Sequence, residues 1–400
     1  MYKKNYLVFL LIILYSNILA GKGNVLTGID VLKENNFSIL KGKNVGLITN
    51  HTGVDRFGKS TIDILFEQKS FKLIRLFSPE HGLRGIYDSQ VSDQIDEKTG
   101  LEIVSLYGKK RKPDKNDLKN IDVLVFDIQD IGCRFYTYIA TMAYAMQAAA
   151  ENNIEFIVLD RPNPIGGKIV DGFVPDTDSI TYLFTSIYPI PTRHGMTIGE
   201  LAKLFNEYFK INCKLTVIKM KNWKRKYLFR DTGLPWINPS PNMKSLEGAL
   251  AYPYIGWLES TQLSMGRGTQ FPFEYFGAPY INKDSLFNIV KNFQIKGARV
   301  IPYSFIPARK NHKFFNQKCN GLRIIIYQPD KFDAFEFGLK VFKTLHELYP
   351  EKFSWSKSFK INLGNSKFEY EFEKNLKTFV KLKEKQIKKF KKIRKNYLLY

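Results

Sequence analysis

Residues 121–134 read Ile-Asp-Val-Leu-Val-Phe-Asp-Ile-Gln-Asp-Ile-Gly-Cys-Arg, an apolar run that stops abruptly in a polar loop. The run from Ile121 to Ile128 is almost wholly apolar, which is typical of a strand covered on both faces. A helix rich in Ala and Met is expected from Tyr138 to Ala150, and a second strand of the buried type follows from Ile154 to Leu159. A strand, a helix and a strand in this order predict parallel pairing.

The same pattern occurs upstream of this unit. Strands expected at residues 45–49 and 72–77 end in Asn50-His51-Thr52-Gly53 and in Ser78-Pro79-Glu80-His81-Gly82, and one more strand is expected at 215–218. We therefore predict an α/β fold with a Rossmann-like parallel sheet and helices on both faces. Ligands of such sheets bind at the carboxyl ends of the strands, so the polar clusters after four successive strands should converge on one crevice.

A length of 400 residues suggests two domains. From Trp223 to Pro279 the pattern changes to loops dense in Pro, Gly and aromatic residues, and the remainder predicts strands near 298–302 and 321–327, a helix near 331–348 and a terminal helix. The predicted division is a leader at 1–21, a Rossmann-like catalytic domain at 22–242, and a smaller C-terminal α/β domain at 243–400 that closes the cleft.

Composition excludes several classes of protein. A hydrophobic content of 44%, with 14% aromatic residues, excludes intrinsic disorder. Three cysteines without metal or redox spacing exclude a disulfide scaffold. Cys133, Cys213 and Cys319 are expected to be buried thiols, and a single disulfide between two of them is the alternative. No Gly-x-Gly-x-x-Gly follows the first strand, and no Gly-x-Ser-x-Gly occurs, which argues against dinucleotide binding and a serine-hydrolase elbow.

About ten of the 23 excess positive charges of the chain lie in one segment near its C-terminal end. The segment from Lys374 to Lys395 holds eleven Lys and Arg residues against one acid, Glu384, and its apolar residues recur at helical spacing. We expect one face of this helix to dock on the domain while the lysines remain in solvent; attraction to anionic wall polymers is the alternative. No basic stripe interleaved with aromatics occurs elsewhere, so nucleic acid is not an expected partner.

The first residues have the pattern of a targeting signal. Lys3 and Lys4 precede a nine-residue apolar run, Leu7 to Tyr15, and Ser16 to Gly21 offers a small-residue exit. This pattern predicts a secretory signal peptide, and therefore a periplasmic or secreted protein without stable membrane insertion after cleavage. An uncleaved anchor helix is the alternative, because Ile18 and Leu19 extend the apolar run.

Glu80 is the strongest candidate for acid–base chemistry. It follows a strand on a Pro-Glu-His-Gly turn that can hold a carboxyl group rigidly at a crevice floor, where a partly apolar setting raises the pKa of an acid. Cleavage of a glycoside needs a second group that stabilises the oxocarbenium-like state or activates water. Asp127, Asp130 and Glu259 are the candidates for that role.

Histidines and arginines gather in the same loops. His51, His81 and His194 could bind substrate, serve structure or hold a metal, but no metal-ligand spacing occurs and no metal is predicted. Arginine forks suit carboxylates, so the arginine set favours an anionic substrate. These arginines are Arg84, Arg134, Arg161, Arg193 and Arg267.

The loop motifs resemble those of a known family. They are Thr49-Asn50-His51-Thr52-Gly53, Ser78-Pro79-Glu80-His81-Gly82, the segment from Phe126 to Tyr138, Leu159-Asp160-Arg161-Pro162-Asn163-Pro164 and Asn238-Pro239-Ser240-Pro241-Asn242-Met243. The chain, over about residues 25–400, is similar in these motifs to the NamZ-type exo-β-N-acetylmuramidases of bacterial cell-wall turnover. The resemblance implies a site in the cleft between the two domains. It also implies release of N-acetylmuramic acid from the non-reducing end of peptidoglycan fragments without a cofactor.

The resemblance also assigns roles to residues. Glu80 is implied as the general acid/base with His81 beside it, and Asp130 is our further catalytic candidate. His51 stands where the family commonly has Gln, which weakens a catalytic role for it. The residues expected to bind substrate are Asn50, His51, Arg84, Asp127, Gln129, Arg134, Tyr136, Arg161, Asn163, Arg193, His194, Asn238, Asn242, Glu259 and Arg267. The lactyl carboxylate of muramic acid gives the arginines a partner. A non-catalytic peptidoglycan-binding protein and a metal-dependent hydrolase that uses the loop histidines are the alternatives.

Overall fold

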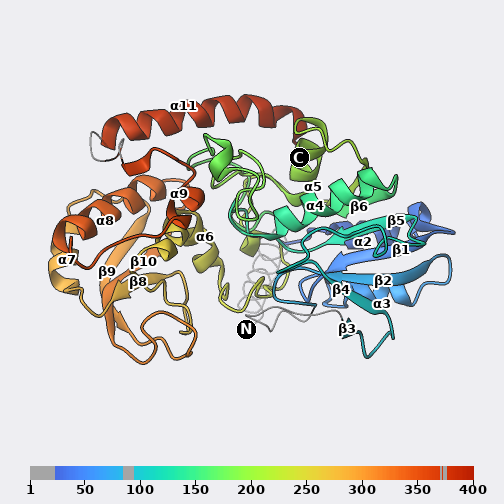
Figure 1. Cartoon of the computed structure of the whole chain (residues 1–400), viewed down its shortest axis with the longest axis horizontal. Helices are drawn as coiled ribbons and strands as arrows, with labels where there is room; N and C mark the ends of the chain where they lie inside the picture. The colour runs from blue at the N-terminus through green and yellow to red at the C-terminus, as the bar shows by residue number, and fades with distance from the viewer. Residues whose placement is uncertain (1–22, 84–93, 370–371, 373–375) are drawn as a thin grey trace, which may run out of the picture.

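The structure, a computed structural model, describes residues 23–83, 94–369, 372 and 376–400. Its larger part contains a seven-stranded sheet in the order β3-β4-β2-β1-β5-β6-β7, in which only the edge strand β3 runs antiparallel to its neighbour (Figure 1). The strands are β1 (Asn44–Thr49), β2 (Lys72–Ser78), β3 (Gln94–Ile95), β4 (Glu102–Ser105), β5 (Val123–Asp127), β6 (Glu155–Leu159) and β7 (Lys214–Ile218). The predicted parallel α/β sheet is confirmed.

The strand order reverses between β1 and β5. From β1 the chain proceeds outward through β2 to β4, and from β5 it proceeds the other way through β6 to β7. Thr49 and Asp127, the last residues of the two central strands, are paired in register. The loops after β1 and β5 therefore lie at the switch point, where open α/β sheets place their ligand crevice.

Helices cover both faces because alternate residues of the strands point to opposite sides. Val123 and Val125 of β5 pack in one apolar cluster with helices α2 (Gly28–Glu34) and α3 (Thr61–Phe66). Leu124 and Phe126 pack in the other with α4 (Tyr138–Glu151) and α5 (Ile198–Glu207). Helix α5 begins with a capping box, in which the Thr197 and Glu200 side chains each accept a hydrogen bond from the other's backbone N–H group.

The smaller part contains a three-stranded antiparallel sheet in the order β8-β10-β9. Its strands are β8 (Tyr275–Ala278), β9 (Ala298–Phe305) and β10 (Cys319–Ile326), and its helices are α6 (Leu246–Ile255), α7 (Lys283–Val290), α8 (Ala334–Leu348) and α9 (Ser358–Leu363). Both α6 and β8 fall in the stretch expected to be loops. Helix α6 is buried on all sides and contains Pro253, so it lacks the one-sided apolar pattern by which a helix is recognised.

Short 3-10 helices complete the chain: η1 (Ser38–Leu40), η2 (Asp178–Ile180), η3 (Phe229–Asp231), η4 (Gly256–Ser260) and η5 (Lys395–Tyr397). The three cysteines are buried and free, as expected. Within the described residues, no helix is both long and apolar enough to cross a membrane. The leader predicted at 1–21 lies outside the described residues.

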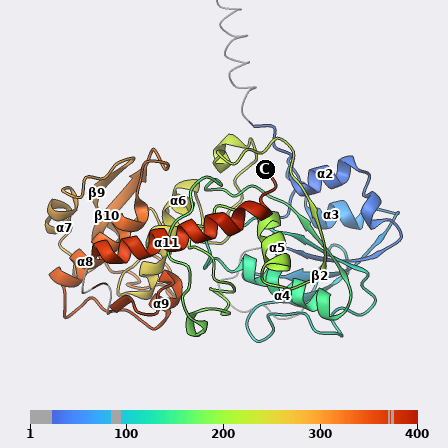
Figure 2. The same cartoon turned by 90° about the horizontal axis from the view of Figure 1, so that it is seen from above.

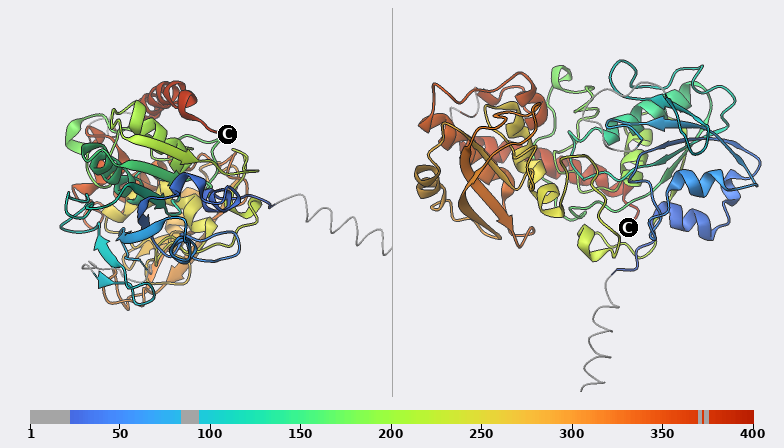
Figure 3. Two further views of the ribbon diagram at one scale, coloured as in Figure 1. Left: turned by 90° about the vertical axis from the view of Figure 1, so that its right-hand side faces the viewer. Right: turned by 90° about the horizontal axis from the view of Figure 1, so that it is seen from below.

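Helix α11 (Leu376–Arg394) connects the two parts from outside. It runs from the lobe that contains β8–β10 back across to α5 (Figures 1 and 2), and the two sheets occupy separate lobes (Figure 3). Its buried side is tied to the larger part, because Lys383 pairs with Asp171 at 2.9 Å and Arg394 donates to the Gly195 carbonyl at 2.9 Å. The expectation that one face of this helix docks on a domain is confirmed. The expectation that its lysines remain in solvent is wrong for Lys383, which is buried because it pairs with Asp171.

Candidate functional site

A hollow of about 230 Å³ is lined by segments from both parts of the chain. Glu80 and His81 come from the turn after β2, and residues 135–138 come from the start of α4. Of the predicted site residues, Glu80, His81, Tyr136, Glu259 and Arg267 line it. The remaining lining residues are Phe135, Thr137, Tyr138, Thr185, Ser240, Tyr252, Gly256 and Asn362. The hollow thus brings together the turn after β2, the segment that follows β5 and residues of the smaller lobe, whereas no residue of 50–53 after β1 or of 160–164 after β6 lines it.

A strained turn presents Glu80 to the hollow. His81 and Gly82 both adopt left-handed backbone conformations, with φ of 72° and 73°. The Gly82 N–H closes the turn on the Pro79 carbonyl at 3.1 Å. Left-handed φ is unfavourable for a residue with a Cβ, so the surrounding structure holds His81 in this conformation. Glu80 is consequently half-buried at a fixed place in the wall.

Hydroxyl groups surround the Glu80 carboxyl. Thr137 Oγ1 donates a hydrogen bond to its Oε2. Burial raises the pKa of Tyr107, and the neighbouring Glu80 carboxylate raises it further. Burial likewise raises the pKa of Tyr136, with the negative charges of Asp130 and Glu80 adding to the effect. Both phenols therefore remain protonated at neutral pH, and the Tyr136 hydroxyl has no hydrogen-bond partner among the described residues.

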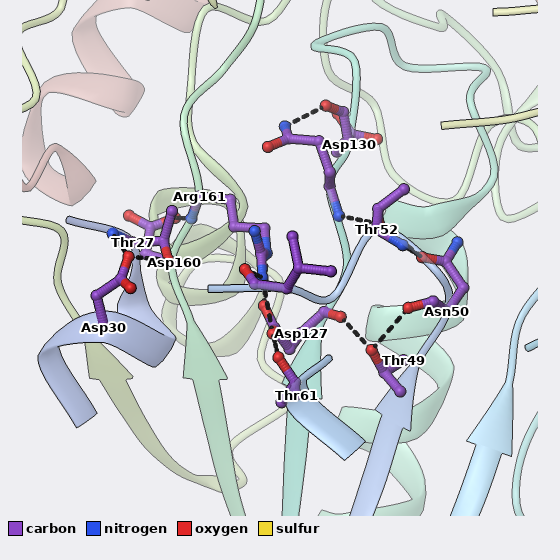
Figure 4. A network of polar contacts seen from close by, with 12 residues as sticks. Thr27, Asp30, Thr49, Asn50, Thr52, Thr61, Asp127, Asp130, Asp160 and Arg161 are labelled. Carbon is purple, nitrogen blue, oxygen red and sulfur yellow. Dashed lines mark hydrogen bonds and ion pairs between the residues drawn. The ribbon is translucent and has the colours of Figure 1, made fainter. Parts of the chain in front are cut away.

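Asp127 and Arg161 form a buried ion pair at the end of β5 (Figure 4). Arg161 donates to both carboxylate oxygens, at 2.5 and 2.8 Å, and Thr61 Oγ1 donates to Oδ2 at 2.5 Å. The Arg161 side chain is 5% exposed and that of Asp127 is 0% exposed. Their charges therefore satisfy each other inside the protein, and the pair joins the end of β5 to the loop after β6. Arg161 also donates to the Val54 carbonyl in the loop after β1 at 2.8 Å.

Asp130 lies near Tyr136 but outside the lining of the hollow. Its Oδ2 accepts the Gly132 N–H at 2.7 Å and lies 4.0 Å from His194 Nε2, and its Oδ1 has no hydrogen-bond partner among the described residues. Burial raises the pKa of Asp130 to about 7. Burial, with the nearby Arg394 and Arg193, lowers the pKa of His194 to about 3, so this imidazole is neutral.

Two of the other predicted arginines bind the protein itself. Arg134 donates to the Asn362 and Ile361 carbonyls at 2.7 and 3.1 Å and so joins the start of α4 to α9. Arg193 donates to the Tyr254 hydroxyl at 2.7 Å and to the Ile165 carbonyl. Arg267, in contrast, pairs with Glu259 on the wall of the hollow. Arg84 lies outside the described residues.

Among the candidate amide and imidazole side chains, some bond to backbone carbonyls of the protein and others keep an amide nitrogen without a partner among the described residues. Gln129 bonds to the Asp130 and Pro162 carbonyls, and Asn163 bonds to the Met196 carbonyl, so these amides brace the loops. His51 Nε2 lies 2.7 Å from the Asn238 carbonyl oxygen, and burial together with the nearby His81 lowers the pKa of His51. Two further amides, Asn50 and Asn242, are buried, and the Nδ2 of each has no partner in the described part of the chain.

Sequence reasoning did not select several lining residues. Thr137 and Tyr138 stand inside the conspicuous segment after β5, and their nearness to Glu80 could have been inferred from that position. Tyr252 lines the hollow and Tyr107 lies beside Glu80, but neither tyrosine stands in a motif that would have distinguished it from the other aromatic residues of the chain. Over residues 23–83, 94–369, 372 and 376–400, no group of three or more His, Cys, Asp or Glu side chains could hold a metal ion.

Comparison with known proteins adds a separate line of evidence. The family model for the N-terminal part of exo-beta-N-acetylmuramidase NamZ matches residues 45–247, and that for the C-terminal part matches residues 250–400. The peptidoglycan beta-N-acetylmuramidase NamZ of Bacillus subtilis is 47% identical over 389 residues, which is 95% of this chain and 92% of that protein.

Solved structures agree with these matches. Two crystal structures of DUF1343 family proteins from Bacteroides fragilis superpose with TM-scores of 0.88 and 0.75, at 40% and 32% sequence identity. Each comparison covers 94% of this chain and 99% of the other. The resemblance therefore extends over both lobes and includes every segment that lines the hollow.

Proposed function

The chain belongs to the NamZ family of exo-β-N-acetylmuramidases, which are glycoside hydrolases, and from this premise we propose that it releases N-acetylmuramic acid from the non-reducing end of peptidoglycan fragments. The observation that carries the proposal is the position of Glu80, a half-buried carboxyl group on the wall of a hollow where the two lobes meet. Phe135, Tyr136 and Tyr252 offer aromatic surface to a sugar ring in the same hollow.

The proposed chemistry begins with a proton on Glu80. Protonated Glu80 gives its proton to the glycosidic oxygen as the bond from that oxygen to the anomeric carbon breaks, and positive charge develops on the sugar ring. The resulting carboxylate is stabilised by the Thr137 hydroxyl. It then takes a proton from the water molecule that adds to the anomeric carbon, which restores the acid and completes the hydrolysis.

The direct test uses a chromogenic β-N-acetylmuramide. The purified protein should release the chromophore, and Glu80→Gln should lower kcat by about 10²- to 10⁴-fold, because Gln keeps the size of the side chain but cannot transfer a proton. The variant should retain its affinity for muramic acid in a binding titration. Full activity in Glu80→Gln would exclude this residue as the acid.

We also propose that the protein acts outside the cytoplasm. The basic residues, apolar run and small-residue exit within positions 1–21 support this location. Expression with and without these residues, followed by fractionation of the cells, should place only the full chain outside the cytoplasm. Equal retention of both forms in the cytoplasm would contradict the proposal.

A further inference from the structure

Arg267 differs from the other described candidate arginines in its access to the hollow. Its side chain is 32% exposed, whereas Arg161 is 5% exposed, and Arg134 and Arg193 are buried. Each of those three donates to carbonyl, hydroxyl or carboxylate oxygens of the protein. Of this set, Arg267 is therefore the guanidinium that a ligand in the hollow can reach.

The guanidinium of Arg267 is held in one orientation. Its Nε and Nη2 donate to the two carboxylate oxygens of Glu259, the second at 2.9 Å, and it lies over the Phe273 ring at 5.0 Å from the centroid. Lys313 Nζ donates to the Glu259 carbonyl at 2.5 Å, and the charge of Arg267 contributes to lowering the pKa of this lysine, after burial. Two cations therefore lie at Glu259, Arg267 at its carboxylate and Lys313 at its backbone carbonyl.

We propose that Arg267 recognises the lactyl carboxylate of N-acetylmuramic acid and that Glu259 is the positioning residue that orients its guanidinium. The inference rests on the proposed function and names the group that sets its sugar specificity. A planar guanidinium suits a carboxylate, and the lactyl carboxylate is the charge that N-acetylglucosamine lacks. Arg267 therefore favours muramic acid over the neutral amino sugar at the same site.

The experiment combines variants of the enzyme with variants of the substrate. Chromogenic β-glycosides of N-acetylmuramic acid, of its lactyl amide and of N-acetylglucosamine are compared by kcat/KM. In the wild type, replacing the lactyl carboxylate of the substrate by the amide should lower kcat/KM by about 10- to 100-fold, which is the range expected for charge-assisted hydrogen bonds. In Arg267→Met the acid and the amide should differ by less than about threefold, because the partner of the charge is gone.

Arg323→Met is the matched control. Arg323 also pairs with a glutamate, Glu274 at 2.7 Å, and lies over an aromatic ring, Phe271 at 4.9 Å, but it does not line the hollow. This variant should keep the wild-type ratio of acid to amide. The inference would be overturned if this ratio were unchanged in Arg267→Met, or if it fell as far in Arg323→Met as in Arg267→Met. A wild-type protein that is inactive on the muramide would instead refute the proposed function.

Discussion

Thr137 is the residue that most directly supports Glu80, because its hydroxyl donates to the carboxylate. Net hydrogen bonds to charged groups contribute about 1.5–3 kcal/mol. We expect Thr137→Val to lower kcat on a chromogenic muramide by about 10- to 100-fold with little change in KM, since the substrate gains its proton from a less well-oriented acid. Steady-state kinetics measures both constants.

Thr141→Val provides the control for this substitution. Thr141 lies one turn further along α4, is fully buried, and bonds to the Thr137 carbonyl rather than to Glu80. The kcat of Thr141→Val should stay within about threefold of the wild-type value, because the removed hydroxyl group contacts no residue of the site. Equal losses in the two variants would show that the effect comes from the helix and not from the contact with Glu80.

Asp130 should make stability depend on pH. Burial raises its pKa to about 7 in the folded protein, against 3.8 for an ordinary aspartate, so the folded state holds the proton more tightly. Its contribution to stability is therefore complete below about pH 4 and is lost as the pH rises toward about 7. Asp130→Asn cannot ionise, so the stability of the wild type relative to this variant should fall by at least about 1 kcal/mol between pH 4 and pH 8.

Urea unfolding of the wild type and Asp130→Asn at several pH values checks this prediction. Burial lowers the pKa of His194 to about 3, so this histidine is protonated only in the unfolded chain at pH 4 to 6 and makes stability rise with pH. Because both proteins contain His194, its contribution cancels in the difference between them. A stability difference that stays constant from pH 4 to pH 8, or that moves in favour of the wild type, would contradict the prediction.

At the level of residues, the sequence predicted which loops carry polar side chains, but it did not predict which groups those side chains contact. Glu80 and Arg267 are polar residues in loops, and so are Arg134 and Arg161. Whether an arginine enters a hollow or bonds to a carbonyl more than 200 positions away, as Arg134 does with Asn362, depends on tertiary packing that one sequence without relatives does not encode locally.

At the level of elements, apolar periodicity predicted the buried strands and the amphipathic helices. The expected strands at 45–49, 72–77 and 215–218 match β1, β2 and β7 to within one residue at each end. The short strands β3 and β4 were not predicted, because two to four residues carry too little pattern. Helix α6 was missed for the opposite reason, since it is apolar all round.

Arg134 illustrates a contact between elements whose loss should affect stability rather than binding. It ties the start of α4 to the carbonyls of α9, and it is fully buried. Arg134→Met should lower the free energy of unfolding by about 3 kcal/mol, because it leaves buried carbonyl oxygens without donors. Lys98→Met removes a largely exposed pair with Asp63 and should lower the free energy of unfolding by less than about 1 kcal/mol.

Chemical denaturation measures both stabilities, and a muramide assay at a temperature where both variants are folded measures KM. A role of Arg134 in substrate binding would appear as a raised KM in the folded variant. An unchanged KM with reduced stability is the result that we expect from the geometry.

At the level of the whole molecule, two lobes share one apolar core. A single cluster of buried side chains includes Phe126 and Phe205 from the larger lobe and Leu322 and Phe342 from the smaller. Helix α11 lies across both lobes (Figure 2). The hollow at the lobe junction is therefore built on a continuous interior, which keeps Glu80 and Arg267 on walls that do not shift independently.

Phe173 should decide whether the two lobes unfold together. Its ring, in the loop region after β6, lies 4.4 Å from the Phe379 ring of α11 and 5.4 Å from the Phe335 ring of α8. Phe173→Ala removes this ring and should lower the free energy of unfolding by about 3–5 kcal/mol, the range for a large buried aromatic side chain. The wild type should unfold in one calorimetric transition, and the variant should unfold earlier and in two steps, because the cavity separates the lobes where they are joined. Phe57→Ala is the control, because the Phe57 side chain is 84% exposed, and its free energy of unfolding should lie within about 0.5 kcal/mol of that of the wild type. Two separate transitions in the wild type would mean that the lobes fold independently and that the shared core does not couple them.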